Sequence, residues 1–556
     1  MWIGMNSLFL VGTTLVLFIL AYRFYGRFLE KLWEVSPARK SPVSEKRDGV
    51  DYVPAKHWTI LFGHHFASIS GAGPILGPVI ACMLWGWLPA ALWILFGSIL
   101  LGGVHDFTSL VLSLRHGGKT VGEITESIMG RKSRVVFSLF LWFTLILVVA
   151  VFASVTANTF LQEPAIVIPS FGLILVAVLF GFLVYRLNCS QVYATLASMV
   201  LLAFLFFLGN KFPLSITFAE SLKIWIIILL LYSFIASILP VNHLLQPRDY
   251  LSSFILVIGL GLGYIGLFTA RPAINAPAYI SFSAAGQKGN LWPMMFVIIA
   301  CGAISGFHSL VASGTTSKQI TTEGDAKKIA YGGMLTEGVL SILALLCVCA
   351  GLYWNKPGSV LNYPELMATG NWIGTFATGY GQITQRIFNP ETGKMLAIIM
   401  INAFVLTTLD TATRITRYIS RELFGESWNV KVFKNRYFST FFVVLIAGWL
   451  AFGNWQKIWP VFGAANQLVA AIALFVAGLF LLMLQKKGSL LAFLPSLFMF
   501  LTTIAALLYQ ARNFYRAKNF LLGNISLLLV LLAAFVILEG VRKMRSLRSS
   551  RHAHNI

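Results

Sequence analysis

The amino-acid sequence predicts an all-α polytopic membrane protein with about fifteen transmembrane helices. Of its 556 residues, 57% are hydrophobic and only 11% are charged, whereas about 25% of the residues of an ordinary soluble protein are charged. The mean hydropathy is +0.79. Because a helix needs about 20 apolar residues to cross a bilayer, the chain has room for more than ten crossings. Little is left for a folded soluble domain, so the composition excludes a soluble enzyme on a membrane anchor.

Apolar runs, bounded by charges and by Gly and Pro clusters, set the order of the predicted spans. The first run has basic residues after it and none before it, which is the reverse of a secretory signal, so it is expected to remain as a span. The segment 353–394 is long enough to hold a re-entrant or interfacial stretch. The fifteen spans are expected at 3–22, 60–86, 88–113, 135–157, 165–185, 192–209, 223–243, 252–270, 292–313, 329–352, 395–413, 438–453, 460–485, 489–510 and 521–540.

Basic residues give the predicted orientation. The net charge of +22 is spread over short loops rather than gathered on one face, which indicates topology and not nucleic-acid binding. Cytoplasmic loops are rich in Lys and Arg. With the N-terminus outside, alternation of the fifteen spans places 31 of the 42 Lys and Arg residues on the cytoplasmic side. The C-terminus is then expected in the cytoplasm.

Two predicted spans are interrupted. The second holds four Gly and two Pro between Gly63 and Pro78, and the ninth holds Gly and hydroxyl residues between Cys301 and Thr316. Proline removes a backbone donor and glycine favours non-helical dihedrals, which a bilayer tolerates only where the backbone lines an enclosed or aqueous cavity. The span order makes the two antiparallel, as at the central site of an inverted-repeat secondary transporter. A packing kink in each helix is the alternative.

A repeat of five spans would divide the chain into five parts. They are a first helix with its loop, the first repeat, an intercalated helix pair, the second repeat, and C-terminal helices with a basic tail, at 1–59, 60–209, 210–291, 292–485 and 486–556. In transporters that resemble the leucine transporter, the third helix of the second repeat carries a hydroxyl pair that helps to hold sodium. Thr407 and Thr408 stand at that place and are the candidate cation ligands.

The unwound stretch of the second span is the candidate site for a substrate carboxylate. Amide groups at the positive end of a half-helix favour an anion, and the ninth span would complete the pocket. The candidate substrate-binding residues are Ser68, Ser70, Gly71, Ala72, Gly73, Pro74, Ser305, Gly306, His308 and Ser309.

Titratable residues within spans are candidates for a coupling proton, because an unpaired charge in a bilayer costs at least about 2.5 kcal/mol. Asp106 has an alternative as the partner of a loop arginine, and Asp410 has one as the i, i+4 partner of Arg414. Glu337 and Glu539 are expected near the interface, within reach of water. The proton-coupling candidates are His64, His65, Asp106 and Asp410.

Other polar residues are open to two interpretations. Asn466 and Gln467 need buried partners, so they either line the cavity or tie helices together. The adjacent His64 and His65 face about 100° apart on a helix and cannot jointly bind one metal ion. A haem or copper enzyme would need further ligands such as His105 and His308. The five cysteines lack metal-site spacing and are expected to pack as small apolar residues, so no metal and no cofactor beyond H⁺ or Na⁺ is expected.

Several stretches match one family in the same order along nearly the whole chain: 21–27, 64–78, 103–107, 239–241, 246–251, 303–319, 406–414 and 459–467. By these stretches the sequence resembles the carbon starvation protein A family of bacterial inner-membrane proteins. The resemblance implies a transporter of the amino acid, polyamine and organocation superfamily that is induced in the cellular response to starvation. It also implies uptake of peptides and, in related members, of pyruvate with protons.

The function expected from the residues and the resemblance together is cation-coupled, and specifically proton-coupled, symport by alternating access in the bacterial inner membrane. The substrate would be a peptide or a small carboxylate such as pyruvate, the lipid bilayer would be the other partner, and no nucleic acid would be involved. A sodium-coupled amino acid or peptide transporter, a membrane metal or haem redox protein, and a channel or nutrient sensor remain as alternatives.

Overall fold

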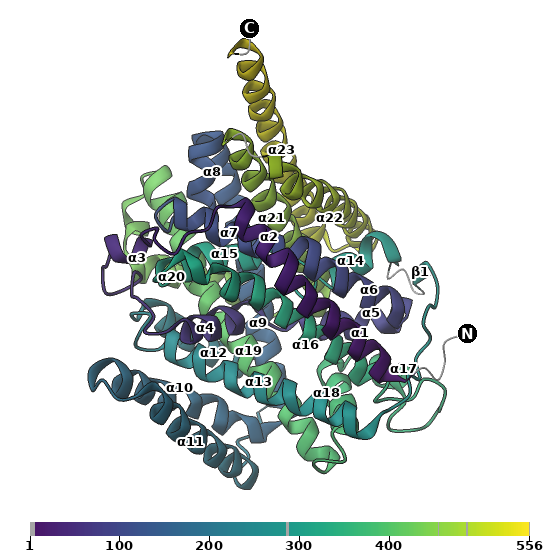
Figure 1. Cartoon of the computed structure of the whole chain (residues 1–556). Helices are drawn as coiled ribbons and strands as arrows, with labels where there is room; N and C mark the ends of the chain where they lie inside the picture. The colour runs from purple at the N-terminus through teal and green to yellow at the C-terminus, as the bar shows by residue number, and fades with distance from the viewer. Residues whose placement is uncertain (1–5, 219, 285–288, 454, 485–486, 555–556) are drawn as a thin grey trace.

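The computed structural model describes residues 6–218, 220–284, 289–453, 455–484 and 487–554, and these form a bundle of helices (Figure 1). Among them, 12 helices are long and apolar enough to cross a membrane, or up to 13 if the bent pair α4 (Trp58–Ile69) and α5 (Gly73–Trp85) is one span. The all-α membrane fold is therefore confirmed. The number fifteen stays a prediction, because the expected spans 292–313 and 438–453 are made of shorter helices.

The first half of the chain supplies the helices before the second break. Turns of π-helix join α1 to α2 and α6 to α7, so each pair makes one continuous span, Ser7–Leu32 and Trp87–Arg115. Besides α4 and α5, the elements are α1 (Ser7–Leu20), α2 (Gly26–Leu32), α3 (Pro42–Glu45), α6 (Trp87–Phe96), α7 (Gly103–Arg115), α8 (Val121–Met129), α9 (Arg131–Gln162), α10 (Val167–Gly181), α11 (Gln191–Lys211), α12 (Ser221–Ile238) and α13 (Leu245–Ala270).

The second half begins with a two-stranded antiparallel ribbon, β1 (Ser283–Ala284) and β2 (Gly289–Asn290). The segment 353–394 holds two short helices, in keeping with the expected re-entrant or interfacial stretch. The helices are α14 (Phe296–Ile298), α15 (Gly306–Gly314), α16 (Gly332–Cys349), α17 (Tyr363–Ala368), α18 (Trp372–Ile383), α19 (Pro390–Ser420), α20 (Arg436–Ala451), α21 (Trp455–Met483), α22 (Leu490–Arg516) and α23 (Phe520–His554).

The longest buried helices form the centre of the bundle. α9 and α19 pack along each other, and α21 packs against α9 and α15. Nearly every residue of α19 and α21 is buried, and in α19 these include the charged Asp410, Arg414 and Arg417. Figure 1 shows α10 and α11 as a hairpin at the edge and α23 projecting at the C-terminus. The predicted divisions at 59, 209, 291 and 485 stay predictions.

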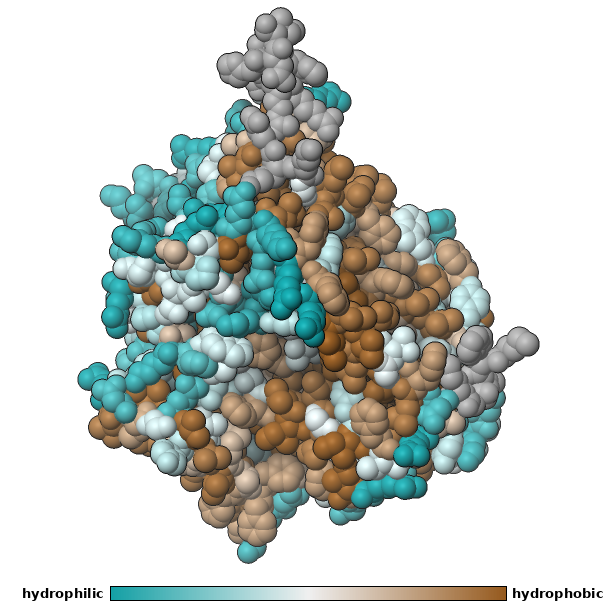
Figure 2. Space-filling view, in the orientation of Figure 1, coloured by the Kyte–Doolittle hydropathy of each residue, from teal (hydrophilic) through white to brown (hydrophobic). Residues whose placement is uncertain are grey.

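The surface carries a broad apolar band. In Figure 2 hydrophobic residues extend across the face from the α10–α11 hairpin towards α22, and hydrophilic residues gather on either side of it, over α2 and α3 and near α17. Exposed apolar side chains such as Leu175, Tyr193 and Leu531 are 68% to 76% accessible, which a membrane would cover.

Loops that are predicted to share one side of the membrane contact one another. Arg39 and Arg115 both pair with Glu323, at 2.7 and 3.1 Å. Arg134 lies 3.3 Å from Glu426. These pairs join the predicted cytoplasmic segments 23–56, 114–134, 314–328 and 414–437. The contacts agree with that grouping, while the side that faces the cytoplasm stays a prediction.

Candidate functional site

The first break lies between α4 and α5, at residues 70–72. Gly71 has a φ of +25°, a conformation that side-chain-bearing residues rarely adopt. Pro74 is in the first turn of α5, where its missing N–H costs no helical hydrogen bond. In the described part of the chain, the amides of Gly71, Ala72 and Gly73 have no acceptor, and the buried Ser70 Oγ has no partner. The break therefore offers donors that the protein does not use.

The second break spans residues 299–305, between α14 and α15. α21 closes over it, and a Cβ on Gly306 would lie 2.2 Å from the backbone oxygen of Asn466. The Asn466 side chain accepts a 2.7 Å hydrogen bond from the Phe307 amide and donates one of 2.8 Å to Ser305 Oγ. Asn466 thus satisfies the polar groups at the start of α15 and ties the helices together.

Two other predicted polar residues are used in the same way. Gln467 Nε2 donates to the Phe296 carbonyl at 2.7 Å, on the α14 side of the break. Ser309 Oγ donates to the Gly306 carbonyl within α15, also at 2.7 Å. The hydroxyls of the second break are therefore engaged by the protein, in contrast to the free donors of the first break.

The two broken spans meet and run antiparallel, as predicted. A Cβ on Gly73 would lie 2.5 Å from Cys301 Sγ, and one on Gly77 would lie 2.7 Å from the last backbone oxygen of α14. At the other end of the crossing, His65 Nδ1 lies 2.9 Å from Thr316 Oγ1. As the residue numbers of these contacts rise along the first broken span, the residue numbers of their partners fall along the second. The two spans therefore run in opposite directions.

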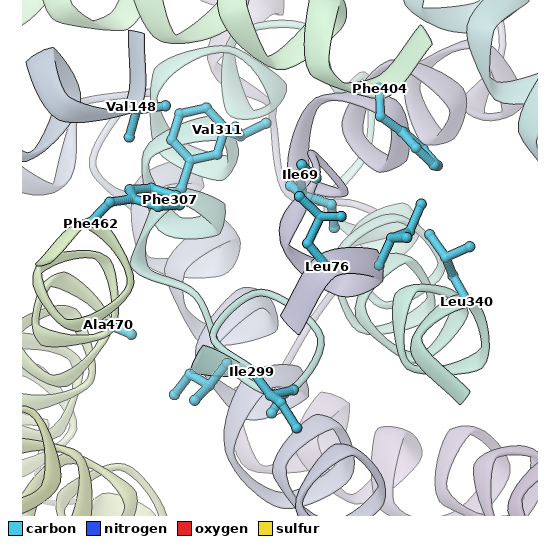
Figure 3. Close-up of a cluster of buried hydrophobic side chains, with 14 of the residues drawn as sticks. Ile69, Leu76, Val148, Ile299, Phe307, Val311, Leu340, Phe404, Phe462 and Ala470 are labelled. Carbon is cyan, nitrogen blue, oxygen red and sulfur yellow. The ribbon is translucent and has the colours of Figure 1, made fainter. Parts of the chain in front are cut away.

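Apolar side chains enclose the breaks. Figure 3 shows Ile69 and Leu76 on the α4–α5 span facing a group formed by Phe307 on α15, Phe462 on α21 and Val148 on α9. A Cβ on Gly71 would lie 3.0 Å from the Phe152 ring of α9. All residues from 63 to 82 are buried, so the site is closed to both sides of the membrane.

The threonine pair of α19 lies beside the first break. Thr408 Oγ1 donates to the Ser68 carbonyl at 3.0 Å. Thr407 Oγ1 accepts a 2.5 Å hydrogen bond from Arg248 Nη2. Thr408 therefore contacts the end of α4 beside the first break, Thr407 is occupied by a guanidinium group, and the cation site stays a prediction.

The alternative that pairs Asp410 with Arg414 is wrong. Asp410 Oδ2 binds Arg248 Nη1 and accepts a 2.6 Å hydrogen bond from Tyr232. Arg414 Nη1 lies 3.1 Å from Asp51 in the loop before α4. The buried face of α19 packs against α12 and α13. Each residue therefore pairs with a side chain of another segment and not with its neighbour on the same helix.

His64 and Ser68 share a face of α4, and both reach a carboxylate of α13. His64 Nδ1 lies 2.6 Å from Asp249 Oδ2, to which Ser68 Oγ donates at 3.3 Å. His64 Nε2 lies 3.3 Å from the amide nitrogen of Gln319, whose oxygen accepts from Gln246 at 2.5 Å. A neutral imidazole that donates through Nδ1 and accepts through Nε2 satisfies this chain.

A second buried cluster joins α7, α15 and α16. Asp106 Oδ1 lies 2.8 Å from His105 Nδ1, and Asp106 Oδ2 lies 2.8 Å from His308 Nδ1. His308 Nε2 lies 3.3 Å from Glu337 Oε2. The alternative of a loop arginine for Asp106 is therefore wrong, because two histidines surround it.

The placement of Glu337 near the interface is also wrong. Its side chain is fully buried. The helical stretch around α16 runs from Glu323 to Cys349 and so begins well before the expected 329. Glu337 therefore lies in mid-span. His308, predicted as a substrate ligand, is held between two carboxylates instead.

Four of the cysteines, Cys82, Cys301, Cys347 and Cys349, are buried, and Cys189 is exposed. Among the described residues, no group of three or more His, Cys, Asp or Glu side chains has the geometry to hold a metal ion. The adjacent His64 and His65 point to different partners, Asp249 and Thr316.

A cavity of about 280 Å³ lies apart from the breaks, between α10, α11, α13 and α19. Its walls are mainly apolar, and Ser170, Arg248 and Asn402 supply its polar groups. Of the Arg248–Asp410 pair, Arg248 lines this cavity.

Arg248 and Asp249 are the site residues that the sequence reasoning missed. They were placed in the loop before an expected span 252–270, but α13 begins at Leu245 and both are buried. The signal was present in the adjacent charges between apolar runs. Buried charges of this kind mark functional positions in membrane proteins.

Comparison with known proteins supports a transporter. Residues 6–362 and 359–506 match the family model described as carbon starvation protein CstA. The peptide transporter CstA of Bacillus subtilis is 31% identical, over 97% of this chain and 97% of its own. The pyruvate/proton symporter BtsT of Escherichia coli is 29% identical, over 90% of this chain and 81% of its own.

A solved structure shows the same fold. The manganese transporter of Eremococcus coleocola, in complex with an aromatic bis-isothiourea compound, superposes with a TM-score of 0.52 over 90% of this chain and 99% of that one. The identity is 13%, so this likeness concerns the fold alone. It agrees with the leucine-transporter-like arrangement of broken helices.

Proposed function

Because the chain belongs to the carbon starvation protein CstA family and is a transporter, we propose that it carries peptides or small carboxylates such as pyruvate by proton-coupled symport. Transport takes place by alternating access across a bacterial inner membrane, with the N-terminus outside and the C-terminus in the cytoplasm. The observation that carries the proposal is the buried set of unused donors at the first break, beside a second antiparallel break.

The substrate carboxylate binds at the start of α5. Three amides at residues 71–73 and the hydroxyl of Ser70 are free there, and the helix dipole adds a partial positive charge. Peptides and pyruvate both carry a carboxylate. Ser305, Gly306 and Ser309 then line the facing break and shape the pocket rather than hold the anion, since their polar groups are already engaged.

The closed site implies how access alternates. Phe152 lies over Gly71, and the Phe462 ring packs edge-on against Phe152 with the ring centroids 5.6 Å apart, with Phe307 beside Phe462 (Figure 3). Movement of the broken spans against α9 and α19 would uncover the donors to one side at a time. A site formed between two such halves is typical of inverted-repeat transporters.

Protons are the proposed coupling ion. The candidates His64, His65, Asp106 and Asp410 are all buried, and three of the four have a charged or titratable partner. Asp410 is held by Arg248 and Tyr232, so it positions the α12–α13–α19 contact. His64 and Asp106 each belong to a cluster directly behind a break, which makes them the better placed for coupling.

Sodium is the alternative coupling ion, and the contact between Thr408 Oγ1 and the Ser68 carbonyl favours it. A hydroxyl and a backbone oxygen at a helix break are hard oxygen ligands that suit a small cation. Thr407 would join them only after Arg248 had moved away.

The test is uptake into proteoliposomes of labelled pyruvate and of a labelled dipeptide. Each is offered under an imposed proton gradient and, separately, under a sodium gradient. We expect accumulation above the outside concentration under the proton gradient alone, and its collapse on addition of a protonophore. Accumulation driven by sodium would mean that the coupling ion is sodium, bound at the threonine site, and not the proton. Equilibration without accumulation would indicate a channel or sensor.

A further inference from the structure

We propose that Glu337 is the residue that holds and releases the coupling proton, with His308 as its immediate partner. This inference rests on the proposed proton symport and adds a site to it, because Glu337 is absent from the residues that the sequence singled out for coupling.

The geometry around His308 is unusual for a buried histidine. One ring nitrogen lies 2.8 Å from a carboxylate oxygen of Asp106, and the other lies 3.3 Å from a carboxylate oxygen of Glu337. The side chains of all three residues are 0% exposed. An imidazole is thus placed between two acids that bulk solvent does not reach.

Hydrogen-bond roles require an additional proton in this cluster. A neutral imidazole has one donor nitrogen and one acceptor nitrogen, so it can donate to only one of two ionised carboxylates. If His308 donates to Asp106, its Nε2 is an acceptor and Glu337 must carry a proton to face it. If His308 donates to both, the proton is on the ring. Either arrangement holds one proton more than two carboxylates with a neutral imidazole.

Glu337 is the acid that carries this proton. Each oxygen of Asp106 has a histidine ring nitrogen at 2.8 Å, one from His105 and one from His308, and donation by these two nitrogens stabilises an ionised carboxylate. Neither oxygen of Glu337 has a hydrogen bond of good geometry in the described structure. An ionised group that is buried and unsatisfied is costly, so Glu337 is the more stable as the neutral acid.

The other titratable groups around Glu337 do not supply a compensating cation. They are His308 on α15, Asp106 on α7, Cys301 at the second break and His65 on α4. Among the described ion pairs, His308 is the partner of Glu337, and no lysine or arginine pairs with it.

The position of α16 connects this proton to the movement of the breaks. His308 lies two residues after Gly306, where α15 begins. A Cβ on Gly302 would lie 2.3 Å from Ser341 Oγ of α16, and a Cβ on Gly333 of α16 would lie 3.2 Å from the ring of His65. Because α16 touches both broken spans, their movement against it changes the contact between Glu337 and His308. When this movement opens the cluster to water on one side, the Glu337 carboxylate becomes solvated and its proton passes to water on that side.

The experiment compares gradient-driven uptake with exchange in proteoliposomes that contain wild type, Glu337→Gln or Glu337→Asp. Labelled pyruvate and a labelled dipeptide are the probes. At one proton per substrate, a gradient of about one pH unit drives about tenfold accumulation in the wild type. Glu337→Gln cannot release a proton, so accumulation should fall to equilibration while exchange of labelled for unlabelled substrate continues. Glu337→Asp should restore part of the accumulation.

A matched control separates this effect from loss of a carboxylate in general. Glu539→Gln removes a carboxylate of α23 that pairs with Arg542 and is 25% exposed, and it should accumulate substrate as the wild type does. Proton-driven accumulation by Glu337→Gln at the wild-type level would overturn the inference and leave the proposed function intact. A wild type that accumulates neither probe under a proton gradient would overturn both.

Infrared spectroscopy of the purified protein covers the case in which Glu337→Gln does not fold. The wild type should show the carbonyl stretching band of a protonated carboxylic acid at neutral pH. The wild-type-minus-variant difference spectrum should show loss of intensity in this band for a folded Glu337→Gln protein, or a shift of the band for Glu337→Asp if the first variant is unstable. Absence of the band from the wild type, or an unchanged band in both variants, would contradict the assignment.

Discussion

Gly73 and Cys301 hold the two broken spans in direct contact: a Cβ on Gly73 would lie 2.5 Å from Cys301 Sγ. We therefore expect Gly73→Val to force the breaks apart and to abolish uptake of either probe. Overpacking of this kind costs about 1–3 kcal/mol, so the protein should still be inserted in the membrane. Uptake at a fixed concentration and the amount of protein in the membrane fraction are the two measurements.

Gly261→Val is the matched control for Gly73→Val, because a Cβ at Gly261 meets no atom within 4 Å. It should retain wild-type uptake. Gly71→Val tests the same break through its positive φ and the nearby Phe152 ring. If the Gly71 and Gly73 variants both transport normally, the first break is not the substrate site.

The buried pair of Arg248 and Asp410 should show strong coupling in a double-mutant cycle. Replacing one partner leaves an uncompensated charge and costs about 3–5 kcal/mol, whereas replacing a buried pair by apolar residues can be nearly neutral. We expect Asp410→Leu and Arg248→Met each to lower the melting temperature in detergent more than the double variant does. Additive losses in the double variant would mean that the two side chains do not act as a pair.

The breaks are the part of the site that was predictable from the sequence, because Gly and Pro act through local backbone conformation. The Gly71 dihedral and the start of α5 at Gly73 depend on residues that are neighbours in the chain. The antiparallel relation of the two spans followed from counting charges in loops, and the contact of Gly73 with Cys301 agrees with it.

The partners of buried charges were not predictable in this way. Asp410 pairs with Arg248 and Arg414 pairs with Asp51, although the spacing of Asp410 and Arg414 suits an intrahelical pair. A local pattern contains no information on which distant helix will pack there. For Glu337, the hydropathy pattern predicts a span that begins at 329, whereas the helical stretch begins at Glu323. The acid is therefore expected near the interface although it lies near the middle of the span.

The loop before α4 should depend on pH through Asp51. Burial raises the pKa of Asp51. The charges of Arg414, Arg417 and Lys318 and a hydrogen bond from Tyr418 together lower the pKa by more than burial raises it, so that it lies below the ordinary 3.8. A lowered pKa in the folded state means that the stabilisation is fully present above the unfolded-state pKa. It is lost as the pH falls through the lower, folded-state pKa.

Asp51→Asn should therefore reduce stability at neutral pH by about 1.5–3 kcal/mol, the range for hydrogen bonds to charged groups. Melting temperatures of wild type and variant, measured from pH 7 downward, should differ most at neutral pH and converge only as the pH falls through the folded-state pKa of Asp51, below the ordinary 3.8. Glu391→Gln is the control, since the Glu391 side chain is 82% exposed and 3.6 Å from Lys394. A constant difference across the pH range would exclude Asp51 as the titrating group.

The single exposed cysteine among the described residues, Cys189, gives a test of the predicted orientation. It lies between α10 and α11 in a loop that the charge pattern assigns to the cytoplasm. The neighbouring Asn188 accepts a 3.0 Å hydrogen bond from Lys56, which belongs to the basic loop before α4. A membrane-impermeant maleimide should therefore label inside-out vesicles and leave intact cells unlabelled.

The label should be absent from Cys189→Ser in both preparations, because the other cysteines are buried. Labelling of wild type in intact cells would mean that the predicted orientation is wrong for the whole chain and not only for one loop. The loop before α4 is joined to α19 through Asp51 and Arg414, and the segment before it is joined to the residues after α15 through Arg39 and Glu323. These segments lie together, so the side that exposes Cys189 also carries most of the basic residues.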